Sequence, residues 1–145
     1  MQLFLGWILI IFPGLLYIGQ IISSVNFPLA QKIGLQENPD HADKLLQRSE
    51  RYTAYWDVVT LCWLPVSGML MVIDYQSWPI FALVGGAVYF DTAGREAAKI
   101  LSLKHEGVSV GAPRQFKLFF STYIIMAALG ITTIAYSVGH IWVDR

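Results

Sequence analysis

Long apolar runs alternate with polar stretches along the chain, and their lengths predict four membrane-spanning helices. Residues 3–22 are almost wholly apolar, and about 20 such residues cross the hydrocarbon core of a bilayer. Residues 54–73 and 116–142 have the same character, and a further run over residues 79–101 gains charges towards its end. The pattern therefore predicts an all-α integral membrane four-helix bundle, with residues 1–145 forming a single transmembrane domain.

A polar stretch separates the first two predicted spans and contains a helix-start signal at residues 38–40, Asn-Pro-Asp. Asn caps free amides, and Pro suits the first turn of a helix. Nothing breaks a helix between Asp40 and Trp63, so we expect the second helix to extend out of the membrane into the cytoplasm. The charges on this extension are typical of a solvated face, and a binding site is the alternative.

Helix packing is predicted by small residues at helical spacing. Gly85 and Gly86 permit close helix approach in the third span, whereas Pro65 predicts a kink in the second because it frees the carbonyl of Leu61. The last span carries one stripe of 3.6-residue periodicity, namely Thr122, Met126, Gly130, Thr133, Ser137 and His140. We interpret this stripe as a packing face, and a polar pathway is the alternative.

Composition agrees with a membrane protein, since 55% of the 145 residues are hydrophobic and 14% are charged, with a mean hydropathy of +0.52. The formal net charge is +0, so no nucleic acid is expected as a partner. The one cysteine, Cys62, excludes a disulfide within the chain. The histidines are far apart in sequence, which predicts no metal site.

Basic residues are concentrated in two of the three connections. The first contains Lys32, Lys44, Arg48 and Arg51, and the third contains Arg95, Lys99, Lys104, Arg114 and Lys117. The positive-inside rule places both connections in the cytoplasm and both termini outside, an N-out/C-out topology. The expected partner is the lipid bilayer, the expected assembly is a homo-oligomer or a larger membrane complex, and the expected location is a bacterial inner membrane.

Charged side chains within the spans are candidates for function. Asp91 and Arg95 are four residues apart, so they can pair on one helix face. A charge below the membrane surface costs about 3 kcal/mol or more unless it faces protein, water or a partner. We expect an intramembrane polar cluster of Asp57, Asp91, Arg95, Tyr55 and Tyr89. The alternative is that Asp91 and Arg95 only make a polar helix end tolerable.

The basic side chains near the cytoplasmic boundary form a candidate anion-binding site, made of Arg48, Arg51, Arg95, Lys99 and Arg114. Guanidinium and ammonium groups that converge on a partly dehydrated cavity bind carboxylates and phosphates well. The alternative is that the lysines extend to the membrane surface without binding anything. No specific catalytic motif occurs, so no catalytic residue is assigned.

This plan resembles the membrane-associated proteins in eicosanoid and glutathione metabolism (MAPEG) superfamily. Arg48-Ser-Glu-Arg51 resembles the Arg-rich start of that family's second helix, and Arg114 resembles a basic residue before its last helix. Members are typically trimers that hold glutathione between subunits. The resemblance therefore implies a glutathione-dependent transferase or peroxidase acting on a lipophilic substrate at the cytoplasmic face.

The sequence departs from the family pattern where the family has Asn and Glu, since Tyr52 and Tyr55 occupy those positions. We therefore favour a small polytopic membrane protein that is a non-catalytic, self-assembling or accessory helix-bundle subunit without a cofactor. The glutathione-dependent enzyme is the alternative.

Overall fold

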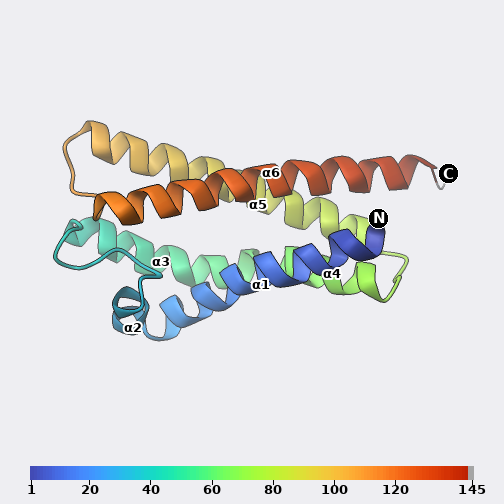
Figure 1. Ribbon diagram of the computed structural model, residues 1–145, viewed down its shortest axis with the longest axis horizontal. Helices are drawn as coiled ribbons and strands as arrows, with labels where there is room; N and C mark the ends of the chain where they lie inside the picture. The colour runs from blue at the N-terminus through green and yellow to red at the C-terminus, as the bar shows by residue number, and fades with distance from the viewer. Residues whose placement is uncertain (144–145) are drawn as a thin grey trace.

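The computed structural model describes residues 1–143, which form helices joined by turns and contain no strand (Figure 1). The helices are α1 (Gln2–Val25), α2 (Phe27–Lys32), α3 (Lys44–Thr60), α4 (Trp63–Val72), α5 (Trp78–His105) and α6 (Pro113–Val143). The all-α prediction is confirmed.

Three helical stretches are long and apolar enough to cross a membrane: α1, α3 continued by α4, and α6. These correspond to the predicted spans at residues 3–22, 54–73 and 116–142. The helix predicted over residues 79–101 is present as α5, which is 28 residues long. It is not among the three stretches, because charged residues interrupt its apolar character from Asp91 onwards.

The long helices run side by side, and the connections separate into two ends (Figure 1). We call the end with residues 33–43 and 106–112 the loop end, and the end with Met1 and residues 73–77 the turn end. The two loop-end connections contact each other through a bridge between Ala42 and Val110. The two basic connections of the sequence thus share one end of the molecule.

The second helix differs from its prediction at both ends. It begins at Lys44, where the Asp43 carboxylate accepts a hydrogen bond from the Leu45 N–H at 2.7 Å. The Asn38 side chain instead accepts from the Asp40 N–H within a turn, so the predicted helix start at residues 38–40 was wrong. Helix α3 ends at Thr60, and α4 begins at Trp63. The expected continuous helix is therefore two helices.

The interruption between α3 and α4 has a clear cause in the sequence. It falls at Leu61 and Cys62, and Leu61 is the residue whose carbonyl Pro65 leaves without a helical donor. The sequence predicted a kink from Pro65 within one continuous helix, and the structure instead has the end of one helix and the start of another at this position.

If α3 and α4 are counted as one stretch, the helices pack as two pairs. One pair is α1 with α3–α4, the other is α5 with α6, and the pairs are joined through α4 and α5. Glycines allow the closest approaches. A Cβ atom added at Gly68 would lie 2.7 Å from the Gly6 carbonyl oxygen, and one added at Gly130 would lie 2.6 Å from the Gly86 carbonyl oxygen. The predicted stripe on α6 is a packing face, since Met126, Gly130, Thr133 and Ser137 are buried.

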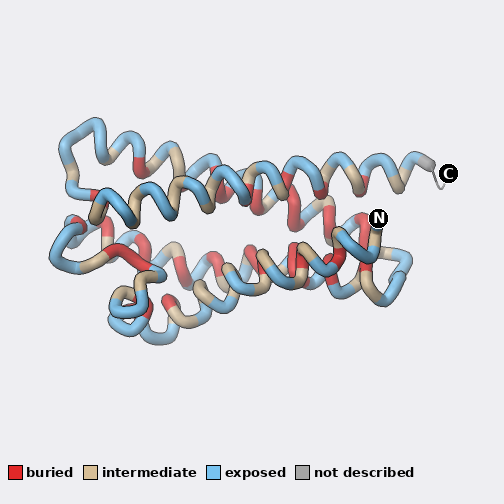
Figure 2. The backbone as a smooth tube through the Cα atoms, viewed as in Figure 1, coloured by how far each residue is buried: buried red, intermediate tan, exposed pale blue. Residues whose placement is uncertain are grey.

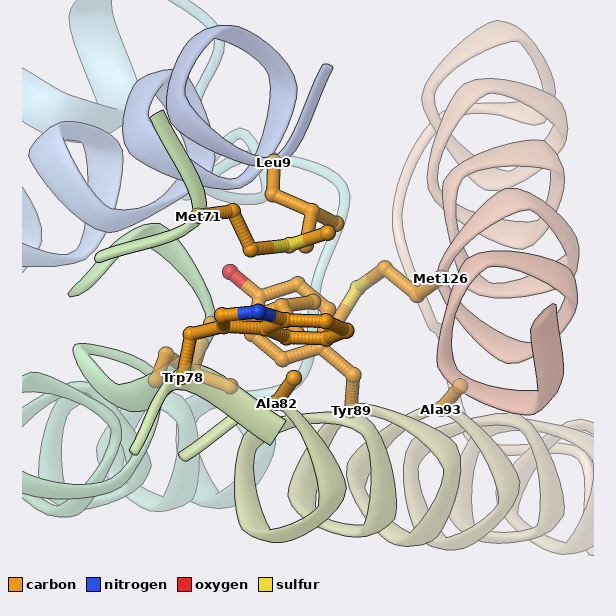
Figure 3. Packing of buried hydrophobic residues seen from close by; sticks show 9 residues of the cluster. Leu9, Met71, Trp78, Ala82, Tyr89, Ala93 and Met126 are labelled. Carbon is orange, nitrogen blue, oxygen red and sulfur yellow. The ribbon is translucent and has the colours of Figure 1, made fainter. Parts of the chain in front are cut away.

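Buried residues lie mainly on helix faces turned towards neighbouring helices (Figure 2). The main apolar cluster lies between the pairs and includes Leu9, Met71, Trp78, Tyr89 and Met126 (Figure 3). A second cluster at the loop end consists of Ala42, Leu46, Ile100 and Val110. The apolar core is therefore divided into two parts along the molecule.

Candidate functional site

A cavity of about 240 Å³ lies between the two helix pairs, on the loop-end side of the main core. Its walls come from α1, residues 34–37, α3, α5 and α6. Four carboxylic acids line it: Glu37, Glu50, Asp57 and Glu96. The remaining lining combines uncharged polar residues, such as Gln20 and Thr53, with apolar ones, such as Leu61 and Phe119.

Helix periodicity explains why these acids point inward. On α3 the buried positions are Leu46, Glu50, Ala54 and Asp57, which recur every three or four residues and form one face. The two acids therefore occupy positions that an apolar residue would normally hold. They lie between Leu46 of the loop-end cluster and Leu61 of the main core.

Helix α5 shows the same arrangement. Glu96 is buried three residues after Ala93 of the main core and four residues before Ile100 of the loop-end cluster. Acids on α3 and α5 thus form a polar layer between the two apolar clusters. This layer explains why the core is divided.

Lys99 neutralises part of this layer. Its ammonium lies 2.7 Å from the Glu50 Oε1 atom and 2.5 Å from the Glu96 Oε2 atom. The side chains of Glu50 and Glu96 are only 11% and 9% exposed. One lysine therefore serves two carboxylates and connects α5 to α3.

Two other acids at the cavity have oxygen atoms without a protein partner. Asp57 and Glu37 are each only 3% exposed, and Asp57 Oδ1 and Glu37 Oε2 make no hydrogen bond to any described residue. A buried polar group left unpaired costs about 1–3 kcal/mol, and such groups normally bind water, an ion or a ligand. The unpartnered oxygens indicate a cavity suited to a polar occupant.

Residues 33–43 carry Glu37 into the site and are held there by three glutamine side chains. Gln36 donates from Nε2 to Ser23 Oγ at 3.1 Å, and Gln31 donates to the Glu37 carbonyl at 3.1 Å. Gln115 of α6 donates to the Gln36 carbonyl at 3.3 Å. Burial, followed by the nearby Glu50 carboxylate, raises the pKa of Glu37 to about 7.

The structure separates the residues of the predicted intramembrane cluster. Asp57 lines the cavity, whereas the Tyr89 hydroxyl lies in the main core and donates to the Pro13 carbonyl at 3.3 Å. Tyr55 is exposed. Arg95 Nε donates to Asp91 Oδ2 at 2.8 Å, as the spacing predicts, but these side chains are 53% and 65% exposed. The pair lies on the outer face of α5.

The residues of the predicted anion site are also distributed over the surface. Arg48, Arg51 and Arg114 are exposed, and Lys99 points towards carboxylates instead of an anion. An anion site formed by these residues stays a prediction. Sequence reasoning missed Glu37 and Glu50, which it assigned to a solvated face, and it left Glu96 out of the candidate cluster.

Among residues 1–143 no group of three or more His, Cys, Asp or Glu side chains is arranged to hold a metal ion. Fold and site together define an all-helical protein with three helices able to cross a membrane and an acid-lined internal cavity. No family model, curated protein or solved structure matches this chain.

Proposed function

We propose that the chain is a four-span integral membrane protein that acts as a non-catalytic binding subunit and takes up a small solute in the acid-lined cavity. The observation that carries this proposal is the pair of unpartnered oxygens, Asp57 Oδ1 and Glu37 Oε2, at a cavity of about 240 Å³. Buried polar atoms normally have a hydrogen-bonding partner, and the cavity provides the space for an occupant beside these two oxygens.

Helix α5 is the fourth span in this proposal. Its 28 residues exceed the roughly 20 that a bilayer core requires. Its charges have partners that make membrane insertion tolerable: Lys99 pairs with Glu50 and Glu96, and Arg95 pairs with Asp91. Paired charges are the form in which ionisable residues are found within membranes.

The proposed topology is N-out/C-out in a bacterial inner membrane. Every basic residue of the two basic connections belongs to the loop-end half of the molecule, and basic connections remain in the cytoplasm. The cavity then lies in the cytoplasmic half of the molecule.

Binding is favoured over self-assembly because the glycines at the closest helix approaches make their contacts within the chain. Gly86 and Gly130 form the α5–α6 contact, so they are not available to a second copy. Assembly into a homo-oligomer or a larger complex stays a prediction. The acid lining is unfavourable for anionic glutathione, and we do not assign the glutathione-dependent activity to this cavity.

Cysteine accessibility tests the proposal at two adjacent positions. Thr53 lines the cavity, whereas Ala54 is buried in the core and does not. In a Cys62→Ser background, Thr53→Cys in inside-out membrane vesicles should react with a membrane-impermeant methanethiosulfonate, and Ala54→Cys should not. If Thr53→Cys is as unreactive as Ala54→Cys, the cavity admits no solute and the proposal fails.

A further inference from the structure

We propose that the solute is a monovalent organic cation, an ammonium that carries an apolar group, with the Asp57 carboxylate as its counter-ion. This inference rests on the proposed function, because it names the class of solute that the cavity would bind.

The balance of charge at the cavity gives the sign of the solute. Four carboxylic acids line the cavity, and Lys99 is the cation that pairs with two of them, Glu50 and Glu96. Asp57 makes no ion pair among the described residues, and its Oδ1 atom has no hydrogen-bond partner. Buried charges in proteins are normally paired. The partner that we infer for Asp57 is therefore a cation, which none of the described residues supplies.

The arrangement of donors favours an organic cation over a metal ion. Calcium takes six to eight oxygen ligands at about 2.3–2.6 Å, and magnesium requires near-octahedral geometry. No set of three acidic, histidine or cysteine side chains in residues 1–143 is close enough for such coordination. An ammonium needs fewer close contacts, because one carboxylate and a few polar groups can stabilise it.

The apolar part of the lining indicates that the cation carries a hydrophobic group. Leu16 of α1, Leu61 between α3 and α4, and Met126 of α6 face the same space as the acids. Phe119 and Tyr123 also line it, and aromatic rings attract ammonium groups. An apolar cavity of about 150 Å³ accommodates benzene, so 240 Å³ leaves room for a phenyl group with a compact ammonium.

Phenyltrimethylammonium is a suitable probe, and tert-butylbenzene is its neutral isostere. The full-length chain in detergent should bind the cation saturably and the isostere much more weakly. Asp57→Asn keeps the shape of the side chain and removes its charge, so it should raise the Kd of the cation by about thirtyfold or more. Asp40→Asn, the same change at an exposed position outside the cavity, should leave the Kd unchanged.

The ammonium could belong to a free solute or to a lipid headgroup, and the two sources can be distinguished. The titration is repeated in nanodiscs of phosphatidylglycerol and in nanodiscs that contain phosphatidylethanolamine. Weaker probe binding in the second lipid identifies a lipid ammonium as the occupant, and equal binding in both identifies a free cation.

Reagent charge provides a second measurement that does not require the Asp57 variant to fold. At Thr53→Cys a cationic methanethiosulfonate should react at least about tenfold faster than an anionic one, after each rate is divided by the rate of that reagent with a free thiol in solution, because carboxylates attract the first reagent and repel the second. Equal rates would overturn the inference, as would equal binding of the isostere or an unchanged Kd in Asp57→Asn. If one of these results overturns the inference but Thr53→Cys still reacts, the proposed solute cavity remains supported. If Thr53→Cys does not react at all, the proposed function itself fails.

Discussion

The acidic residues of this chain differ in burial and in ion pairing, although similar stretches of sequence contain them. Asp91 lies on the outer face of α5 and pairs with Arg95 at 2.8 Å. Glu50 and Glu96 are buried and share Lys99, and Asp57 is buried with no ionic partner among residues 1–143. The free-energy cost of burying each carboxylate therefore depends on its partner. Lys99 is the residue that most stabilises the polar layer, because it pairs with two of the buried acids.

Loss of Lys99 should be strongly destabilising. Lys99→Met leaves two buried carboxylates facing each other, and removing one partner of a buried ion pair costs about 3–5 kcal/mol. A second change, Glu96→Gln, should recover much of this loss because it removes one of the two charges. Unfolding free energies in detergent measure both effects, with exposed Lys117→Met as the control. Simple additivity of the two changes would show that the residues are not coupled.

Glu37 should make stability dependent on pH. Its folded pKa is about 7, above the ordinary value of 4.5, because of burial and the Glu50 carboxylate. As pH rises from about 4.5 to 7, the unfolded chain releases this proton more readily than the folded chain does, so stability falls. The loss reaches up to about 3 kcal/mol above pH 7 and is absent below pH 4.5.

The measurement for this effect is the unfolding free energy of wild type and Glu37→Gln at pH 5 and pH 8. The variant should be more stable than wild type at pH 8, and its advantage should shrink at pH 5. Glu106→Gln, a change at an exposed residue, should show no such difference. An advantage of Glu37→Gln that is the same at both pH values would contradict the raised pKa.

At the scale of the helices, glycine positions decide how closely the elements approach. In α5, Gly86 faces the Gly130 carbonyl oxygen of α6, whereas Gly94 has no atom near its Cβ position. The same substitution at these two sites of one helix should therefore have opposite effects.

Gly86→Ala should destabilise the protein by about 1–3 kcal/mol, the usual cost of overpacking, because its Cβ would lie 2.9 Å from that carbonyl oxygen. Gly94→Ala should be neutral or stabilising by up to about 1 kcal/mol, since Ala is the better helix former. Thermal unfolding in detergent compares the two variants. Equal effects would mean that α5 and α6 do not approach at Gly86.

The helices and the packing face of α6 could be predicted from the sequence, whereas the start of α3 could not. Apolar run lengths predicted the helices, and 3.6-residue periodicity predicted the packing stripe of α6 that includes Gly130 and Thr133. The start of α3 was missed because two capping signals lie close together, and Asp43 is used instead of Asn38. Local capping preferences are too similar in strength to decide between neighbouring starts.

The cavity could be predicted only in part. Asp57 was expected in a polar cluster because it follows the start of an apolar run, but Glu50 was assigned to a solvated face. Its four-residue spacing from Leu46 and Ala54 does place it on the buried face of α3. Glu37 has no such periodic signal, because a connection of irregular structure brings it into the cavity.

For the whole molecule, the important feature is the difference between its two ends. The turn end holds Met1, the last residues of α6 and an aromatic group in which Trp78 stacks on Tyr136, with ring centroids 5.6 Å apart. The loop end holds the two basic connections, which are joined by the Ala42–Val110 bridge, and the cavity lies on this side of the main core. In the proposed orientation the cavity is on the cytoplasmic side of a bilayer.

Cysteine labelling at the two ends tests this account most directly. Ser77 lies in the connection at the turn end, and Ser109 lies in the connection at the loop end. In a Cys62→Ser background, Ser77→Cys should react with an impermeant thiol reagent in intact cells, and Ser109→Cys should react only after the membrane is permeabilised. Labelling of Ser109→Cys but not Ser77→Cys in intact cells would reverse the orientation. Labelling of neither position before permeabilisation would contradict a bundle with its turn end outside.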